Sequence, residues 1–137
     1  MVENKTTRSR RSECPISCSL ELLGDTWTLL VLRDVLFKGK RAFGDIASEE
    51  GIASNILTER LARLEREGIL ERGIDPMDRR KKVIMPTERA WLIAPLLVEF
   101  ASFGTEHWNS CCEESKRLVS AYREDPSTFI SALRTKA

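Results

Sequence analysis

The stretch that decides the fold is SNILTERLARLEREG, residues 54–68. Its leucines recur at intervals of three and four residues, which is the spacing of one face of an α-helix. The spacing predicts a helix of residues 54–67, and the glycine that follows predicts its end. With the leucines turned to the core, the opposite face carries Asn55, Glu59, Ala62, Arg63 and Arg66. Periodicity alone does not distinguish a solvated surface helix from a helix that binds DNA bases. The flanking segments are therefore needed to choose between these two interpretations.

Three helices are expected before this one. The first covers residues 14–23, where a proline suits the first turn and a glycine follows the last. The second covers residues 25–39, with Asp25 as a candidate N-cap. The third covers residues 42–49 and buries Phe43. Joined by a tight turn, the third helix and the helix quoted above make a helix-turn-helix.

A β-hairpin with a basic tip follows the helix-turn-helix. Short strands are predicted at residues 69–72 and 82–85, on either side of a turn-rich segment. The tip carries a run of like charges: Arg79, Arg80, Lys81 and Lys82. Crowded like charges are unfavourable unless an anion or the solvent screens them. The hairpin is therefore interpreted as a wing that contacts DNA phosphates, and a solvated basic turn is the alternative.

The rest of the chain is predicted to be helical. A long helix of residues 87–108, kinked at Pro95, precedes a helix of residues 113–123 and a short one after Pro126. This order predicts a mainly α fold with a small β-hairpin, a winged helix-turn-helix with C-terminal dimerisation helices. The long helix carries more apolar side chains than one small domain can bury: Trp91, Ile93, Leu96, Leu97, Phe100, Phe103 and Trp108. We expect this excess to pack against a second copy of the chain, and packing against the first helix of the same chain is the alternative.

Length and composition favour one compact domain. The chain has 137 residues, of which 42% are hydrophobic and 31% charged, enough apolar material for a core. We expect a flexible basic arm at residues 1–13, a winged helix-turn-helix domain at residues 14–108 and a helical extension at residues 109–137. The formal net charge of +1 hides a basic front half, because residues 87–125 carry four basic and seven acidic side chains. No apolar run has the length of a membrane helix, which predicts a cytoplasmic protein without a membrane partner.

The outward helix face and the wing divide the expected DNA contacts between them. Asn55, at the start of the face, suits base reading because its amide both donates and accepts. Ser54 and Thr58 suit phosphate or base contacts, and Arg63 lies further along the same side. Glu59 weakens binding near phosphates unless it accepts from a cytosine amino group or pairs with Arg63. The wing cations would bind phosphates whatever the base sequence.

Two other functions fit parts of the pattern. The helix of residues 54–67 has three basic and three acidic side chains, so the hairpin could contact an acidic protein, in a winged helix without sequence-specific DNA binding. An aromatic effector could lie between Trp27, Trp91 and Phe100 at the dimer interface, although core packing explains the same residues. No metal, cofactor or enzymatic activity is expected: His107 is the only histidine, and the sequence has no glycine-rich phosphate loop or nucleophile elbow.

Several blocks of sequence stand in a fixed order. They are CP (14–15), LGDTWTLLVLR (23–33), RAFGDI (41–46), LTERL (57–61) and LEREGIL (64–70). Together these blocks resemble the HxlR family of bacterial transcriptional regulators over residues 14–108. The resemblance implies a winged-helix fold, a homodimer built from the first helix and the C-terminal helices, and an inverted-repeat operator bound by both recognition helices. It also implies repression or activation of nearby genes.

The resemblance assigns roles to single residues as well. Arg41 stands where the family usually has an arginine, and it would contact a phosphate. Ala42 replaces a second arginine, which two nearby lysines would offset. Ala53 stands where the family often has a serine cap, a role that Ser54 would take over by a shift of one residue.

A cysteine at the position of Cys14 senses oxidants or electrophiles in some family members. The positive end of a helix dipole favours the thiolate at such a position. Oxidation there would change the spacing of the two recognition helices, with Cys111 or Cys112 as resolving partners. A buried, unreactive cysteine is the alternative. The expected partners are therefore double-stranded DNA, a second copy of the chain, and an oxidant or small-molecule effector.

Overall fold

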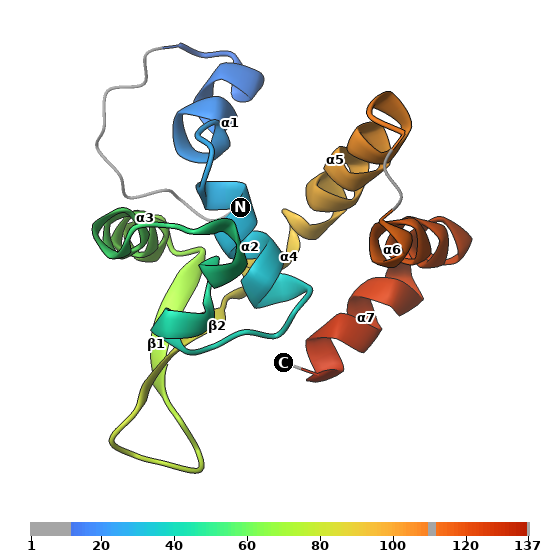
Figure 1. Ribbon diagram of the computed structural model, residues 1–137. Helices are drawn as coiled ribbons and strands as arrows, with labels where there is room; N and C mark the ends of the chain where they lie inside the picture. Colours follow the sequence, from blue (N-terminus) through green and yellow to red (C-terminus); the bar gives the residue numbers. More distant parts are fainter. Residues whose placement is uncertain (1–11, 110–111, 137) are drawn as a thin grey trace.

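The structure is a computed structural model that describes residues 12–109 and 112–136. The helices and strands are α1 (Pro15–Leu23), α2 (Thr28–Leu36), η1 (Phe43–Asp45), η2 (Ser48–Glu50), α3 (Ser54–Arg66), β1 (Leu70–Ile74), β2 (Lys82–Pro86), α4 (Glu88–Trp91), α5 (Ala94–His107), α6 (Glu113–Glu124) and α7 (Pro126–Lys136). The hairpin of β1 and β2 projects from one end, and α5, α6 and α7 form the opposite side (Figure 1). The predicted mainly α fold with a small β-hairpin is confirmed.

The helix quoted at the outset is the helix that the spacing of its leucines predicts. Leu57, Leu61 and Leu64 are at most 3% exposed and belong to the same buried cluster as the apolar face of α2. Burying each leucine stabilises the fold by about 1.5–3 kcal/mol. This packing fixes α3 by one face and leaves the opposite face in solvent.

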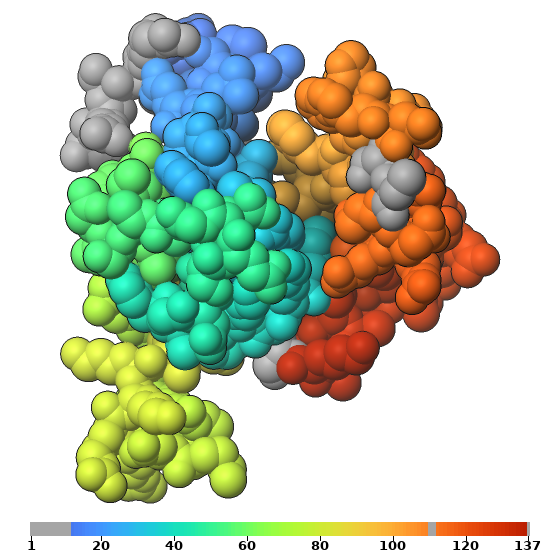
Figure 2. Space-filling model, in the orientation of Figure 1, coloured from blue at the N-terminus to red at the C-terminus, as the bar shows by residue number. Residues whose placement is uncertain are grey.

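The wing is a two-stranded antiparallel hairpin. Its register runs from Leu70 opposite Pro86 to Ile74 opposite Lys82. Two aspartates shape the turn by accepting from backbone amides: Asp75 Oδ1 from the N–H of residue 77, and Asp78 Oδ1 from the N–H of residue 80. The hairpin stands away from the body of the molecule as a separate protrusion (Figure 2).

The helix predicted at residues 42–49 is wrong. The segment instead forms the two 3-10 turns η1 and η2, joined through Ala47, whose φ of 55° is left-handed. The amide of Ala47 donates to the buried carboxylate of Asp34 at 2.7 Å, which holds this unusual conformation. Phe43, predicted to be buried, is 41% exposed.

The prediction of one continuous helix at residues 87–108 is also wrong, because two helices occupy this segment. The chain forms α4, breaks at residues 92–93, and begins α5 with Pro95 in its first turn. Proline lacks an amide hydrogen and is well tolerated in a first helical turn, so it opens a new helix where a kink was expected.

The last two helices pack back onto the rest of the molecule. Arg123 of α6 donates to Glu99 of α5 through two bonds of 2.6 and 3.1 Å. On α7, the ring of Phe129 lies 6.2 Å from that of Phe37 at the end of α2. The helical extension, α6 and α7, therefore contacts α5 and the end of α2. No described helix has the length and apolar character needed to cross a bilayer.

Candidate nucleic-acid interface

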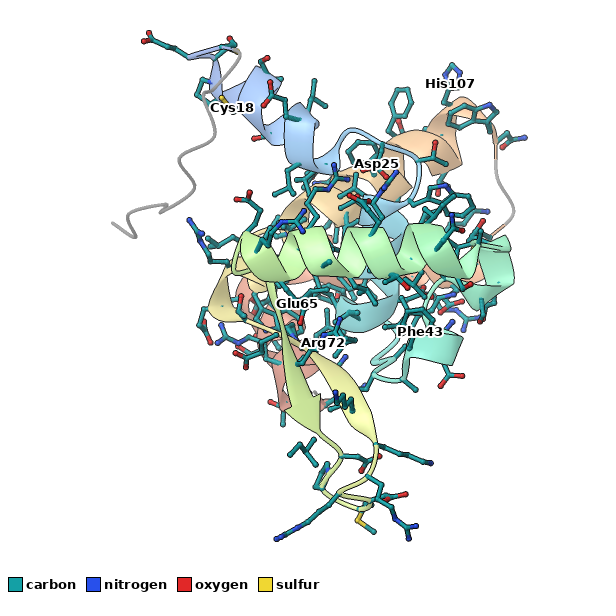
Figure 3. The ribbon with its side chains drawn as sticks, turned by 90° about the vertical axis from the view of Figure 1, so that its left-hand side faces the viewer. Cys18, Asp25, Phe43, Glu65, Arg72 and His107 are labelled. Carbon is teal, nitrogen blue, oxygen red and sulfur yellow. The ribbon has the colours of Figure 1, made fainter. Side chains whose placement is uncertain are left out.

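The outward face of α3 is exposed. Ser54, Asn55, Thr58 and Glu59 are all exposed, and so is Arg66 at the end of the helix. Figure 3 shows α3 lying across the front of the molecule, with Asp25 along one side and Glu65 and Arg72 along the other. The wing hangs below it on the same side, so one surface presents both the polar face and the basic turn.

The start of α3 differs from the expectation for Ser54. The residue before the helix is Ala53, which cannot cap with a side chain, and Ser54 is the first helical residue. The carbonyl of Ser54 accepts the hydroxyl of Thr58 at 2.8 Å. The expected transfer of the cap to Ser54 therefore does not occur, and the Ser54 hydroxyl is left at the exposed helix start.

Arg63 does not point outward as expected. Its Nη2 donates to Asp25 Oδ2 at 2.9 Å and lies 3.3 Å from Thr28 Oγ1. Its side chain is only 18% exposed. The guanidinium of Arg63 therefore binds Asp25, which precedes α2, in place of solvent. Helix periodicity cannot predict this contact.

Glu59 finds a different partner from the one predicted. It pairs with its neighbour Arg60 rather than with Arg63. The Glu59 side chain remains 49% exposed. A carboxylate in this place can accept from a base amino group and repels phosphate.

The basic turn of the wing is open to solvent. Arg79, Arg80 and Lys81 are exposed, and Lys82 at the start of β2 is exposed as well. Arg80 is 95% exposed, with its Nε 3.8 Å from Asp78. These cations are free to reach an anion because the wing aspartates accept mainly from the turn backbone.

Arg41 is turned into the protein. Its Nη1 donates to the carbonyl of Val35 at 2.7 Å and to that of Lys40 at 2.9 Å. Burial lowers the pKa of Arg41. The guanidinium thus binds carbonyls at the end of α2, and the phosphate contact that the family resemblance implies for Arg41 stays a prediction.

Asp34 organises a set of charges that sequence reasoning missed. Its carboxylate is fully buried and accepts from Arg33 Nε, Lys40 Nζ and the amide of Ala47. Burial by itself raises the pKa of Asp34, but these hydrogen bonds outweigh it and hold the pKa below its ordinary value. The lysines expected to replace a missing arginine are thereby engaged: Lys40 with Asp34 and Lys38 with Glu49.

A small hollow of about 200 Å³ separates α3 from the wing. Its lining combines apolar and basic side chains: Phe43, Thr58, Leu61, Arg72, Lys82 and Ile84. Arg72 Nε also donates to Glu65 of α3 at 2.8 Å. Lys82, the last residue of the basic run, lines this hollow together with Arg72.

The apolar surface expected at a dimer interface is exposed on α1 and α5. It consists of Ile16, Leu20, Leu96, Phe100, Phe103 and Trp108, exposed by 40% or more. A groove of about 480 Å³ runs between these two helices and is visible in Figure 2 between the blue and orange segments.

The three aromatic residues of the suggested effector pocket lie in different surroundings. Trp91 is 7% exposed and lies beneath Arg134, whose guanidinium carbon is 5.9 Å from the ring centre. Trp27 precedes α2 and gives its amide to Asp25. Phe100 is 56% exposed and lines the groove between α1 and α5. The structure thus places Trp91 in the core, as the alternative reading had it.

Two of the described cysteines, Cys14 and Cys112, directly precede a helix, and Cys18 lies within α1. Cys14 is exposed and directly precedes α1. The thiol of Cys18 donates a hydrogen bond to the carbonyl of Ser12 at 3.0 Å. Cys112 is exposed before α6, and hydrogen bonds from Ser115 lower the pKa of its thiol. Cys111 lies outside the described residues. Within residues 12–109 and 112–136, no group of histidine, cysteine and carboxylate side chains is arranged to hold a metal ion.

An exposed helix-turn-helix face beside a basic wing defines the class of winged helix-turn-helix DNA-binding proteins. Comparison with known proteins gives the family. The model of the family described as HxlR-like helix-turn-helix matches residues 22–111, and the chain belongs to this family. The resemblance seen in the sequence blocks is confirmed.

Individual relatives agree with this assignment. The protein sll1512 of Synechocystis sp., named as an uncharacterized HTH-type transcriptional regulator, is 35% identical over 94 residues, 68% of this chain and 69% of the relative. The HTH-type transcriptional regulator YodB of Bacillus subtilis is 30% identical over 108 residues, 75% of this chain and 96% of YodB.

Solved structures show the same fold. The crystal structure of PA1607 matches with a TM-score of 0.67 at 28% identity, covering 76% of this chain and 72% of that one. The reduced form of YodB matches with a TM-score of 0.56 at 27% identity, covering 75% and 98%. Family and fold together make the chain a DNA-binding transcriptional regulator.

Proposed function

We propose that the protein binds an inverted-repeat operator as a homodimer, with α3 of each copy in the major groove and each wing on the flanking backbone. The observation that carries the proposal is the placing of the polar face of α3 and the basic turn of the wing on one side of the molecule (Figure 3). A helix fits the major groove, where each base pair shows a distinct pattern of donors and acceptors. The proposal assigns the protein no chemical reaction.

Asn55 is the proposed base-reading residue. It is exposed in the first turn of α3, and its amide can donate to and accept from an adenine edge. Thr58 lies one turn further along, and Ser54 at the helix start suits a phosphate. Glu59 would accept from a cytosine amino group, which makes its contribution depend on the base opposite it.

The wing supplies the contacts that do not depend on sequence. Arg79, Arg80 and Lys81 are exposed, and Lys82 extends the same charge toward α3. Cations of this kind bind phosphates and release counterions, so their contribution falls steeply with salt. Arg41 and Arg63 are left out of the proposed contacts because other groups of the protein hold them.

Dimerisation is supported by the exposed apolar side chains of α1 and α5. Phe100 and Phe103 are 56% and 61% exposed on one helix, and Ile16 is 72% exposed on the other. Contiguous apolar surface of this kind favours association of two copies through the same patch. A two-fold symmetric pair would read half-sites about 34–36 Å apart, one turn of DNA, or a multiple of it.

Selection of bound fragments from the host genome tests the proposal. We expect the recovered fragments to share an inverted repeat, and a duplex with one half-site scrambled to bind at least about tenfold more weakly. Sedimentation of the free protein should show a dimer. Fragments without a shared sequence, or a protein that shifts no duplex at low salt, would contradict the proposal and favour a winged helix that binds proteins.

A response to oxidants through Cys14 is a second, separate part of the proposal. Cys14 is exposed at the start of α1, beside the apolar surface proposed for dimerisation. The relative YodB is known in a reduced and in a diamide-treated form. We expect Cys14 to react with an alkylating probe faster than Cys18, and loss of operator binding on oxidation to disappear in Cys14→Ser. An unchanged response in Cys14→Ser would rule out this role.

A further inference from the structure

Two arginines of the recognition helix are bound to one carboxylate outside it. Arg60 Nε donates to Asp25 Oδ1 at 3.0 Å, and Arg63 Nη2 donates to Asp25 Oδ2 at 2.9 Å. The three side chains are 22%, 18% and 25% exposed, respectively for Arg60, Arg63 and Asp25. One carboxylate thus uses both oxygens to hold two cations of the DNA-facing helix.

Asp25 is itself held in place from its other side. It accepts from the backbone amides of Trp27 at 2.8 Å and Thr28 at 3.0 Å, and from the Thr28 hydroxyl at 2.5 Å. Thr28 is fully buried at the start of α2. Burial raises the pKa of Asp25, but the hydrogen bonds from Thr28, Trp27 and Arg60 outweigh it and hold the pKa well below its ordinary value. The carboxylate is therefore charged and fixed to the core.

The two arginines flank the polar face of α3. Their side chains are long enough to reach a phosphate beside the major groove if nothing else held them. The Nε of Arg63 is buried without a hydrogen-bond acceptor among the described residues. The charge of Asp25 therefore holds this guanidinium although one of its donors stays unsatisfied.

We propose that Asp25 is a positioning residue that withholds Arg60 and Arg63 from DNA and so limits how strongly the protein binds DNA of any sequence. The inference rests on the proposed binding of DNA through α3. Each phosphate contact strengthens binding to any sequence, whereas base contacts strengthen binding only to the operator. Keeping two guanidiniums away from the backbone lowers non-specific affinity and leaves the base contacts of Asn55 intact.

The substitution Asp25→Asn tests this role. Asparagine keeps an oxygen for the amides of Trp27 and Thr28. It removes the charge that binds Arg63 and that shares Arg60 with Glu59. With random duplex, we expect log K to fall with log salt more steeply, by about 0.9 for one released arginine and about 1.8 for two. Between 200 and 50 mM salt this is an additional gain in affinity of about 3-fold to 12-fold. Because phosphate contacts add to binding of any sequence, the gain should appear on the operator as well, and the ratio of operator to random affinity should stay within about twofold.

Two further variants separate release of the arginines from a change of net charge. Arg63→Gln should alter DNA affinity less than about twofold in the unaltered chain, yet remove part of the gain when combined with Asp25→Asn. Glu71→Gln makes the same change of charge on β1, where within the described part of the chain Glu71 holds no arginine. It should leave the salt slope within about 0.3 of that of the unaltered chain.

The outcomes distinguish this role from simple support of the fold. If Asp25 only stabilises α3, then Asp25→Asn lowers the free energy of unfolding and weakens binding to both duplexes, and the inference is overturned. An unchanged slope, or a steeper slope that Arg63→Gln and Arg60→Gln together do not reverse, also overturns it. Failure of the unaltered chain to bind any duplex overturns the proposed function itself, and this inference with it.

Discussion

The basic residues of the wing and those of the helix-turn-helix differ in what holds them. On the wing, Arg80 is 95% exposed and its Nε is 3.8 Å from the nearest carboxylate. In the helix-turn-helix, Lys40 is 18% exposed and 3.1 Å from the buried Asp34, and Arg63 is equally enclosed beside Asp25. A count of positive charges treats these three residues alike, but Arg80 is available to a polyanion without loss of a short internal bond, whereas Lys40 and Arg63 are not.

The difference arises from what the acids of each region do. In the wing, Asp75 and Asp78 accept from backbone amides of the turn, so the neighbouring cations keep their charge in solvent. Asp25, by contrast, precedes α2 and pairs with Arg63 of α3, and Asp34 lies near the end of α2 and accepts from the amide of Ala47. Their carboxylates need cations because an unpaired buried charge is costly.

Removal of Asp34 should have the largest effect. Asp34→Ala leaves Lys40 and the amide of Ala47 without their buried acceptor, which should lower the free energy of unfolding by about 3–5 kcal/mol. Urea unfolding followed by circular dichroism measures this value. Asp45→Ala, at an exposed position of η1, is the control and should change it by less than about 0.5 kcal/mol. Equal losses in the two variants would mean that Asp34 does not organise the turn.

Neutralising the wing should have the next largest effect, on DNA rather than on the fold. The combined change of Arg79, Arg80 and Lys81 to glutamine should reduce the salt slope of binding by about 2.7. The affinity of the unaltered chain should then fall about 40-fold more than that of the variant between 50 and 200 mM salt.

Arg41→Gln is the matched control for the wing variant. It removes one cation of the helix-turn-helix that donates to Val35 and Lys40, so it should lower the free energy of unfolding by about 1–3 kcal/mol and leave the salt slope unchanged. A slope reduced by about 0.9 in Arg41→Gln would show that this arginine turns outward to a phosphate, and the contrast between the two regions would be lost.

Acid should weaken the protein through the same carboxylates, with a smaller effect. The pKa values of Asp25 and Asp34 are lowered in the folded state, so their stabilisation is complete above the unfolded value of about 3.9 and is lost as the pH falls through the folded values. Below about pH 4, the free energy of unfolding should decrease with falling pH more steeply in the unaltered chain than in Asp34→Asn. The difference between the two slopes should be at most about 1.4 kcal/mol per pH unit. Parallel curves for the two proteins would contradict this assignment.

Sequence periodicity was sufficient for the elements whose position depends on local pattern. The leucine spacing predicted α3 to within one residue of Ser54–Arg66, and the basic turn between two short apolar runs predicted the wing. The predictions at residues 42–49 and 87–108 failed for different reasons. The first segment is shaped by a buried carboxylate 13 residues before Ala47 in sequence, and the second is divided by Pro95 acting as a helix start.

In the candidate site, too, local sequence pattern predicts which residues are exposed but not which residues pair over long distances in sequence. Asn55 and Thr58 are exposed as the helix pattern predicts, because burial follows from the leucines alone. The pairing of Arg63 with Asp25 joins residues 38 apart, and neither side chain has a local pattern that indicates the other. The mixed charge of α3 is compatible with a protein partner or with a pair of Glu59 and Arg63, and neither interpretation points to Asp25.

The most direct test of the central claim is a salt series with Asn55→Ala and Arg80→Ala on the selected operator and on random duplex. We expect Asn55→Ala to lose about 10-fold to 100-fold in affinity for the operator, with little loss on random DNA. Arg80→Ala should lose similar amounts on both duplexes and reduce the salt slope by about 0.9. If both variants lose equally on operator and random DNA, then α3 does not read the sequence and the division of roles between helix and wing is wrong.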